Sequence, residues 1–333
     1  MKPVLILGGS GQAGSGAAAV LRRWHPALPL TIAGRDLGRA QRVADELGTA
    51  TAVTIDLQRS DLGLPAGDGY SAVVATVWDA HLHGLRFAQD RGLPYLSISS
   101  GLLEIAPEVV ASAQRASAAP VVVASHFCAG VLVPATVNLA REFERIDTIR
   151  IGALLDESDV GGPAGLADLE RWSAASPAGL VRRDGVFRWV NGPDADVSVS
   201  SLDGTVVPGQ RIGILDVPSL ALATGAPNVS FDFAVGESAG RRGGGGPSLE
   251  VRIDLEGEGA GGAHLSRTHY LVHPEGQRPL TALGLALSIE RLLGLRGEPV
   301  SPGIHTPEAL LDPAYVADRL KDIGAEFVAA QRP

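Results

Sequence analysis

Apolar residues in the first 125 positions gather in short runs that alternate with segments of helical spacing. These runs, each typical of a buried strand, lie at 4–7, 30–33, 52–55, 72–77, 95–99 and 121–125. Between them, apolar residues recur at the spacing of one helix face after Asp36, which favours the N-cap position, and in segment 107–116, which opens on proline. The alternation of strands and helices predicts a parallel, doubly wound sheet.

After residue 145, apolar and polar positions alternate with a period of two. This pattern, typical of strands with one buried face, covers 147–154, 229–235, 249–257 and 264–272. It predicts a second sheet that is mainly antiparallel. The glycine-rich segment 240–247 separates two of these strands, and we expect it to be a mobile hairpin tip rather than a phosphate-binding loop. Helical patterns at 280–294 and 314–324 follow.

A glycine pattern follows the first strand directly and opens an alanine-rich helix. Its residues have the spacing G-x-G-x-x-G and are Gly9, Ser10, Gly11, Gln12, Ala13 and Gly14. In a dinucleotide-binding loop the first glycine permits a tight turn, the second lets the backbone approach a pyrophosphate, and the third allows close packing of helix on strand. The position between a strand and a helix therefore predicts a dinucleotide site.

The end of the second strand selects between two dinucleotides, because the ribose 2′ position is recognised there. Gly34 stands where a discriminating acid often lies, and Arg35 can make a bidentate contact with a phosphate. We therefore expect NADP(H) to be preferred to NAD(H). In the alternative interpretation, Arg35 is a surface charge paired with Asp36.

The predicted fold class is α/β, with a doubly wound parallel-sheet Rossmann domain and an α+β domain that has a mainly antiparallel sheet. We expect the dinucleotide-binding domain at 1–128 and a substrate and dimerisation domain at 129–304. The C-terminal helix, at about 305–333, is expected to pack back on the first domain.

Composition adds limits on partners and location. The chain has 333 residues, 45% hydrophobic and 20% charged, which is enough for two domains with their own cores. Its net charge is −9 and Lys2 and Lys321 are its lysines, so we expect neither nucleic acid nor a membrane as partner. One cysteine excludes an internal disulfide framework, and the apolar start is too short for a signal peptide or membrane span. The cytoplasm is the expected location.

Several segments resemble the saccharopine dehydrogenase-like reductases, including the saccharopine reductase branch. The resemblance covers about residues 1–140 and rests on VLILGGSGQAGSG, TIAGRDLGRAQRVADELG, TIDL, and GLPYLSISSG followed by PEVVASAQRA. It implies adenine contacts at Asp56 and Leu57, a nicotinamide side lined by Thr76 and Val77, and Ser99 and Ser100 beside the nicotinamide or the substrate. It also implies that the second domain carries the substrate and often a dimer interface.

The sequence departs from this family at two places. Cys128, Ala129 and Gly130 stand where saccharopine reductases have an Asp-Pro-Gly turn facing the amino-acid substrate, and Ser97 stands where many relatives have an acid. Both changes remove partners for a substrate ammonium group. We therefore expect a less polar or differently charged substrate than saccharopine.

Candidate proton donors lie after the fourth, fifth and sixth strands, whose carboxyl ends meet at one edge of a doubly wound sheet. Asp79 can take a proton or pair with an iminium, and His81 or His126 titrates near neutrality. The alternatives are that Asp79 caps the next helix, His81 is solvated and His126 is a hydrogen-bonded loop histidine. No Y-x-x-x-K pair is present, which excludes the short-chain dehydrogenase mechanism.

The substrate contacts and the metal question complete the candidate site. Trp78 offers a ring face to a cation or a flat substrate, Ser100 lies after the fifth strand, and Trp172 is the second-domain aromatic that we expect to touch substrate. His81 and His83 are two positions apart, which would place them on different faces of a helix, so we expect no metal site.

We predict an NADPH-dependent oxidoreductase acting on a C=N or CH–NH bond of a small metabolite, working as a homodimer. A carbonyl reductase is an alternative. Another is an acylating semialdehyde dehydrogenase, in which the Cys128 thiolate attacks an aldehyde and His264 or His269 is the base. A non-catalytic NADP-binding protein is the third alternative.

Overall fold

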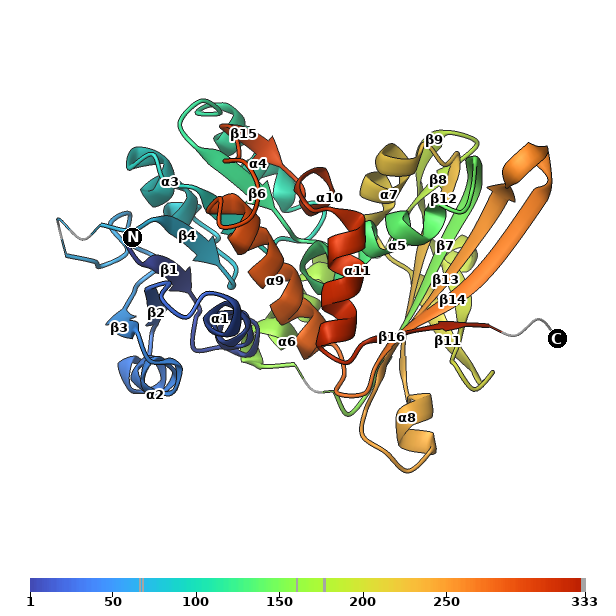
Figure 1. Cartoon of the computed structure of the whole chain (residues 1–333), viewed down its shortest axis with the longest axis horizontal. Coiled ribbons are helices and arrows are strands. Elements are labelled where there is room, and N and C mark those ends of the chain that lie inside the picture. The colour runs from blue at the N-terminus through green and yellow to red at the C-terminus, as the bar shows by residue number, and fades with distance from the viewer. Residues whose placement is uncertain (66, 68, 160, 176–177, 331–333) are drawn as a thin grey trace. The chain divides into compact units, whose positions relative to one another are not determined.

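The structure is a computed structural model that describes residues 1–65, 67, 69–159, 161–175 and 178–330. The chain divides into two units (Figure 1). Unit 1 comprises Met1–Ser125, Gly161–Arg171 and Thr281–Leu311, and unit 2 comprises His126–Val160, Trp172–Leu280 and Asp312–Pro333. Each unit is assembled from three separate stretches. The sequence predicted a first domain at 1–128, with the C-terminal helix at about 305–333 packed back on it, and a second domain at 129–304.

Unit 1 contains a parallel sheet whose described strands follow the order β15-β6-β5-β4-β1-β2-β3. The strands are β1 (Val4–Leu7), β2 (Leu30–Gly34), β3 (Ala50–Thr54), β4 (Ala72–Ala75), β5 (Tyr95–Ser97), β6 (Pro120–Val123) and β15 (Gly303–His305). The strand β1 pairs in parallel with both β2 and β4, so the order of connection reverses there. This is the topology of a dinucleotide-binding domain and confirms the predicted Rossmann fold.

Helices cover this sheet. Those that lie wholly or mostly in unit 1 are α1 (Gln12–Trp24), α2 (Leu37–Leu47), α3 (His83–Asp90), α4 (Ile105–Ala113), α6 (Pro163–Ala175), α9 (Arg278–Leu292) and α10 (Pro307–Leu310). Every residue of β1, β4 and β6 is buried, as expected for parallel strands between helical layers. The Asp36 carboxylate caps α2 by accepting from the Arg39 N–H at 3.0 Å, as the sequence predicted. The helix α4 begins two residues before Pro107.

Unit 2 contains a mixed sheet in which most strands are antiparallel. Its described strands are β7 (Arg145–Asp156), β8 (Gly179–Arg183), β9 (Val186–Val190), β10 (Asp196–Ser200), β11 (Val206–Arg211), β12 (Asn228–Gly236), β13 (Leu249–Glu258), β14 (His264–His273) and β16 (Glu326–Ala329). The main path runs β10-β11-β12-β7-β13-β14-β16, and β8 joins β12 to β9. The predicted mainly antiparallel second sheet is confirmed.

The strand β7 lies between β12 and β13. It pairs with β12 in parallel and with β13 antiparallel. The segment 240–247 therefore does not connect two paired strands, and its interpretation as a hairpin tip is wrong. Alternation with a period of two identifies a half-buried strand but not the direction of its neighbour, which is why the sequence did not reveal the parallel pair.

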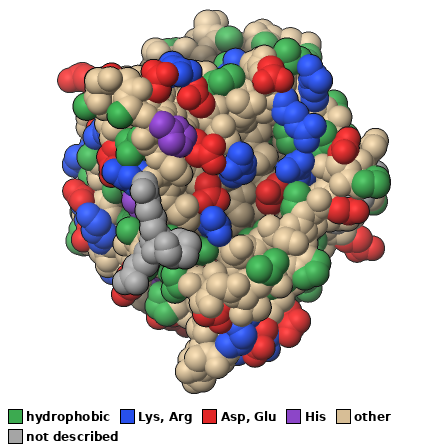
Figure 2. All heavy atoms as spheres, turned by 90° about the vertical axis from the view of Figure 1, so that its right-hand side faces the viewer, with side chains coloured by type: hydrophobic (Ala, Val, Ile, Leu, Met, Phe, Trp, Pro, Cys, Tyr) green, Lys and Arg blue, Asp and Glu red, His purple; other side chains and the backbone are tan. Residues whose placement is uncertain are grey.

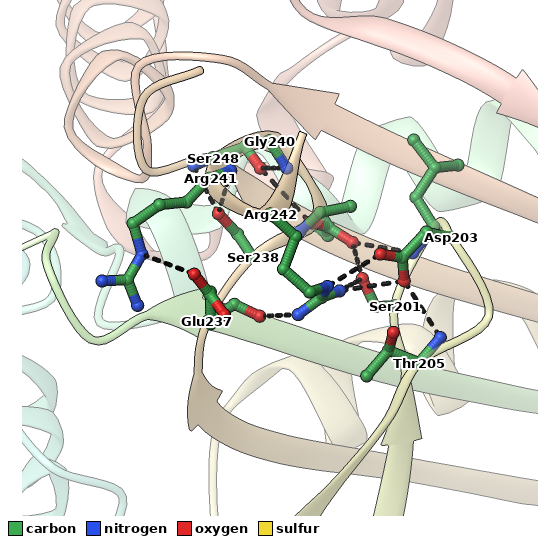
Figure 3. Close-up of polar contacts among 12 residues, drawn as sticks. Ser201, Asp203, Thr205, Glu237, Ser238, Gly240, Arg241, Arg242 and Ser248 are labelled. Carbon is green, nitrogen blue, oxygen red and sulfur yellow. Dashed lines mark hydrogen bonds and ion pairs between the residues drawn. The ribbon is translucent and has the colours of Figure 1, made fainter. Parts of the chain in front are cut away.

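A polar network holds the segment 240–247 in place (Figure 3). Arg242 donates to Asp203 from Nε and Nη2, at 2.7 and 2.9 Å, and Arg241 Nε donates to Asp156 at 3.1 Å. The buried Glu250 accepts from the Ser201 hydroxyl at 2.6 Å and from the Ala239 N–H at 2.6 Å. Each buried carboxylate is thus surrounded by donors, as burial of a charge requires.

The helices of unit 2 are α5 (Leu132–Ala140), α7 (Asp216–Thr224), α8 (Ala239–Arg242) and α11 (Pro313–Asp322). The helix α11 packs against α5 within unit 2, and the part of the C-terminal region that belongs to unit 1 is β15 and α10. The described 3-10 turns are η1 (Phe127–Gly130), η2 (Gly192–Asp194) and η3 (Ala260–Gly262). Within the described residues, no helix has the length and apolar character needed to cross a membrane.

Charged side chains of both signs are intermixed on the face of the molecule in Figure 2. Surface ion pairs join neighbouring strands of the unit 2 sheet, for example Arg150 Nη1 with Glu256 at 2.9 Å. Such exposed pairs contribute little to stability because water screens them. The stability of this sheet comes instead from its buried apolar residues, such as Ile151, Phe231 and Ile253.

Candidate functional site in unit 1

The glycine loop between β1 and α1 is tightly packed against backbone. A Cβ atom on Gly14 would lie 2.7 Å from the Gly8 carbonyl oxygen, and one on Gly9 would lie 2.9 Å from that of Ile6. Gly11 is the N-cap of α1 and forms no side-chain cap in the described structure, so no cap side chain accepts from the first N–H groups of α1. This end of α1 fits a pyrophosphate, which accepts from free N–H groups and is favoured by the helix dipole.

The residues expected to recognise the 2′ position lie at the end of β2. Gly34 is buried, and a Cβ on it would lie 3.1 Å from Ser10 Oγ, which places the loop and the end of β2 side by side. Arg35 is exposed. The Asp36 carboxylate turns to the start of α2 as its cap, so the alternative pairing with Arg35 is replaced by a bond to the backbone of α2.

The end of β4 adjoins the glycine loop. Thr76 is buried and its hydroxyl donates to the Leu7 carbonyl at 2.9 Å, and the Val77 side chain stands 2.5 Å from the position of a Cβ on Gly8. After β3, the exposed Asp56 carboxylate accepts from the Gln58 N–H at 2.9 Å. Thr76 and Val77 therefore lie beside the glycine loop, and their predicted place at the nicotinamide stays a prediction.

Asp79 caps the beginning of α3. Its carboxylate accepts from the His83 N–H at 3.1 Å and from the Gly84 N–H at 2.6 Å, and its side chain is buried. Burial raises the pKa of Asp79, against the lowering effect of these N–H donors. The structure thus supports the capping alternative for Asp79 and leaves its catalytic role a prediction.

His81 and His83 differ from the prediction. The helix α3 begins at His83, so His81 lies in the turn before it, and the two rings stack with centroids 5.2 Å apart. The reasoning that placed them on different faces of one helix is wrong, because the turn folds them together. Among the described residues, no group of three or more His, Cys, Asp or Glu side chains could hold a metal ion.

A buried acid that the sequence analysis missed lies beside the end of β5. Glu108 on α4 accepts from the hydroxyls of Ser97 and Ser100, the latter at 3.1 Å. Burial raises the pKa of Glu108, while the two hydroxyls lower it and the nearby charge of Asp79 adds to the rise. Glu108 directly follows Pro107 in the helical pattern at 107–116, where an acid in the first turn is ordinary, so nothing in the sequence indicated this contact.

Arg171 forms a second cluster in the same region and was also missed. Its Nε donates to Glu104 Oε1 at 2.6 Å, its Nη1 donates to Asp168 Oδ1 at 2.8 Å, and its Nη2 donates to the Ser99 carbonyl at 2.7 Å. The guanidinium also lies over the Trp78 ring. We expected the Trp78 ring to receive a cationic or flat substrate. In the structure a face of this ring contacts the Arg171 guanidinium. Burial raises the pKa of Asp168 in spite of Arg171.

The remaining candidates belong to unit 2. His126 Nε2 lies 2.8 Å from the Ser219 hydroxyl, which fits the alternative of a hydrogen-bonded loop histidine. Cys128 is 2% exposed and lies in a left-handed conformation with φ of 50°, as does Ala129. Trp172 follows Arg171 on α6 and is partly exposed. The catalytic roles expected of His126 and Cys128 stay predictions.

No protein-family model matches this chain, and no curated protein matches it. Saccharopine dehydrogenase (L-Glu forming) from Saccharomyces cerevisiae matches in structure with a TM-score of 0.67 at 14% identity, over 99% of this chain and 100% of that chain. A scyllo-inositol dehydrogenase from Lactobacillus casei gives a TM-score of 0.48 at 12% identity, over 97% of each chain. A myo-inositol dehydrogenase from Corynebacterium glutamicum gives 0.47 at 15% identity over 100% of both chains. The chain therefore has the fold of saccharopine dehydrogenase, the family that its sequence resembles.

Proposed function

We propose that the protein is an NADP(H)-dependent oxidoreductase acting on a C=N or CH–NH bond of a small metabolite. The observation that carries the proposal is the open N-terminus of α1 behind the close-packed Gly9 and Gly14, which suits a dinucleotide pyrophosphate. The fold shared with a protein named as a dehydrogenase supports it. The preference for NADP(H) over NAD(H), the imine as reacting bond and a homodimeric state are parts of this proposal.

Residues of this chain are proposed to bind each part of the cofactor. N–H groups from Gln12 onward bind the pyrophosphate, Arg35 binds a 2′-phosphate, and Asp56 with Leu57 flanks the adenine. The nicotinamide end extends toward Thr76 and Val77. When bound, the dinucleotide supplies or accepts the hydride, and the chain must bind the substrate and move the proton.

The groups for substrate and proton lie beyond the ends of β4 and β5. Ser100 and Trp78 are proposed to contact the substrate in unit 1. Trp172, which belongs to unit 2, stays a predicted substrate contact. Asp79, His81 and His126 remain candidates for proton transfer, since each titratable group must be within hydrogen-bond reach of the reacting atom. We do not extend the proposal to an acylating dehydrogenase, because a thiolate nucleophile must be accessible and Cys128 is 2% exposed.

The test is a survey of NADPH oxidation by the full chain with cyclic imines, keto acids plus amines, and aldehydes. We expect oxidation with at least one imine, and faster oxidation of NADPH than of NADH. Turnover of aldehydes alone would replace the proposal by a carbonyl reductase. Cofactor binding without turnover of any compound would replace it by a non-catalytic NADP-binding protein.

A further inference from the structure

A buried carboxyl group joins two serines of one loop in unit 1. Glu108 is 2% exposed, and its two oxygens have different partners. Oε1 accepts from the hydroxyl of Ser97, the last residue of β5, and Oε2 accepts from the hydroxyl of Ser100 at 3.1 Å. The chain turns back after β5 to begin α4, which is why residues 97, 100 and 108 meet.

The two serines differ in their access. Ser97 is buried at 5% exposure, whereas Ser100 is half-buried and its N–H donates to Ser125 Oγ at 3.2 Å, beyond the end of β6. Ser100 therefore stands at the carboxyl ends of β5 and β6, the edge at which open parallel sheets bind their ligands. One oxygen of Glu108 is thus bonded to a buried serine, and the other is bonded to a serine at the ligand-binding edge of the sheet.

The surroundings of Glu108 disfavour its charge. Across the described residues, Glu108 takes part in no ion pair. The charged group that acts on Glu108 is Asp79, from the loop after β4. The buried Tyr95 of β5 is also near, since the charge of Glu108 raises the pKa of Tyr95. The strand β15, which packs on α4, carries His305, whose ring is hydrogen-bonded to the Ser301 carbonyl. Burial and the charge of Asp79 both raise the pKa of Glu108. A carboxyl in this setting holds a proton at higher pH than an exposed glutamate does.

We infer that Ser100 donates the proton of the reduction and that Glu108 stores it and passes it on. The inference rests on the proposed function and names a proton route for it. In the reducing direction, a bound dinucleotide would supply the hydride for the new C–H bond, and the nitrogen would take the hydroxyl proton of Ser100 with the electron pair of the C=N bond. For this step the Ser100 hydroxyl, which donates to Glu108 Oε2 in the structure, turns to the nitrogen and accepts a hydrogen bond from the protonated carboxyl. The Glu108 carboxyl proton then replaces the lost proton on Ser100, and the resulting carboxylate regains a proton from water. Glu108 acts here as a positioning residue, and Ser100 is the group that touches the substrate.

The matched variants are Ser100→Ala and Ser97→Ala, because each removes one hydroxyl from the same carboxyl group. They are compared on the imine of the survey with the highest kcat/KM. Ser100→Ala breaks the route, and we expect kcat to fall about 10²-fold while NADPH affinity stays the same. Ser100→Thr keeps a hydroxyl and restores most of the loss. Ser97→Ala keeps the proton route, so its kcat should fall less than that of Ser100→Ala.

The pH profile of kcat distinguishes a role of Glu108 in proton supply from a purely structural role. A stored proton is lost as pH rises through the pKa of Glu108, so kcat of the parent protein should fall on the alkaline side. Ser97 lowers that pKa by its hydrogen bond, so Ser97→Ala should move the fall to higher pH. In Glu108→Gln, which keeps the shape of the side chain, the fall should disappear together with about 10²-fold of kcat. Equal losses of kcat in Ser97→Ala and Ser100→Ala, with unchanged profiles, would overturn the inference.

A second measurement needs no substrate. Carbon NMR of the chain labelled at the glutamate carboxyl, with Glu108 assigned by its absence in Glu108→Gln, follows the titration in the presence of NADPH. We expect a midpoint above that of the other glutamates, and a further rise in Ser97→Ala. Ionisation of Glu108 at the ordinary glutamate pKa overturns the inference whether or not any imine is reduced. If no compound of the survey is reduced, the proposed function fails separately, and this titration still decides whether Glu108 holds a proton.

Discussion

The guanidinium of Arg171 lies over the indole ring of Trp78, with its central carbon 4.1 Å from the ring centroid. Trp78 follows β4, and Arg171 lies on α6, more than ninety positions further along the chain. Together with the bonds of Arg171 to Glu104 and Ser99, this contact fixes the segment 161–171 to unit 1. The preceding end of the segment is held as well, since the Gly162 N–H donates to Gln12 Oε1 at 3.0 Å.

Removal of Arg171 should release this segment. Arg171→Ala removes three donated bonds to partly buried oxygens, and we expect a loss of about 1–3 kcal/mol in the stability of unit 1, measured by urea unfolding. Limited proteolysis should cut within 161–175 faster than in the parent protein. The control is Arg115→Ala, which removes an exposed ion pair to Asp90 and should change little. Equal protease resistance of the Arg171 variant would contradict the assignment.

Arg35 should select the cofactor. A bidentate contact of Arg35 with a 2′-phosphate would contribute about 1.5–3 kcal/mol, so Arg35→Ala should weaken NADPH binding about tenfold or more and spare NADH. Fluorescence titration measures both affinities. Arg23→Ala removes an equally exposed positive charge at the opposite end of α1 and serves as the control. Equal losses for both cofactors, or tighter binding of NADH by the parent protein, would refute the preference.

Gly14 should tolerate no side chain. A Cβ atom there would lie 2.7 Å from both Gly8 O and Gly9 Cα, so Gly14→Ala must displace the loop. We expect a loss of about 1–3 kcal/mol in stability and loss of dinucleotide binding. Gly165 on α6 has no heavy atom within 4 Å of its Cβ position, and Gly165→Ala should leave both properties intact. Calorimetry with and without NADPH compares the two variants.

Asp79 should behave first as a helix cap. Asp79→Ala leaves the N–H groups of His83 and Gly84 without an acceptor, and we expect a loss of about 1–2 kcal/mol in stability. Asp79→Asn keeps an acceptor for one of these two N–H groups and should lose less. With Ser100 as the proton donor, kcat of the Asn variant should stay within a few fold of the parent. A fall of about 10²–10⁴-fold in kcat, with NADPH affinity unchanged, would instead make Asp79 the acid.

The pH dependence of stability should differ between the two units. In unit 2, burial alone would raise the pKa of Asp156, but hydrogen bonds from Ser238 and Ser158 outweigh it and lower the pKa. A lowered pKa stabilises the fold above the unfolded value of about 4, and this stability is lost as pH falls through the folded pKa. Urea unfolding of the parent protein and of Asp156→Asn, followed from pH 7 downward, should converge in acid. In unit 1 the raised pKa values of Asp79 and Glu108 have the opposite sign, since their ionisation as pH rises costs stability.

Local sequence signals were sufficient where a residue acts through its own neighbours. The apolar runs located β1, β2 and β4, the glycine spacing located the loop before α1, and Asp36 was identified as a cap because a cap bonds three positions ahead. These features need no knowledge of distant parts of the chain. The fold class followed from their order.

Contacts between segments far apart in the sequence could not be predicted in the same way. Arg171 lies in a segment of ordinary helical pattern, and no neighbouring residue in the sequence indicates that Trp78 or Ser99 is its partner. Glu108 resembles an exposed first-turn acid of a helix, and its burial depends on how α4 returns to β5. The strand β15 has three residues, too few for a periodic signal, and becomes a strand only by pairing with β6.

The late position of β15 and α9 in the chain has a consequence for synthesis on the ribosome. The first 125 residues emerge early, but the outer edge of β6 and the face of α1 beside Gly16, where Ala282 packs, receive their partners only from residues 281–311. At about 5–20 residues per second, the nascent sheet waits roughly ten to forty seconds with an unpaired edge strand. An edge left open for that time is a template for pairing between neighbouring nascent chains, so we expect truncation before residue 281 to yield aggregated protein rather than a free-standing first unit.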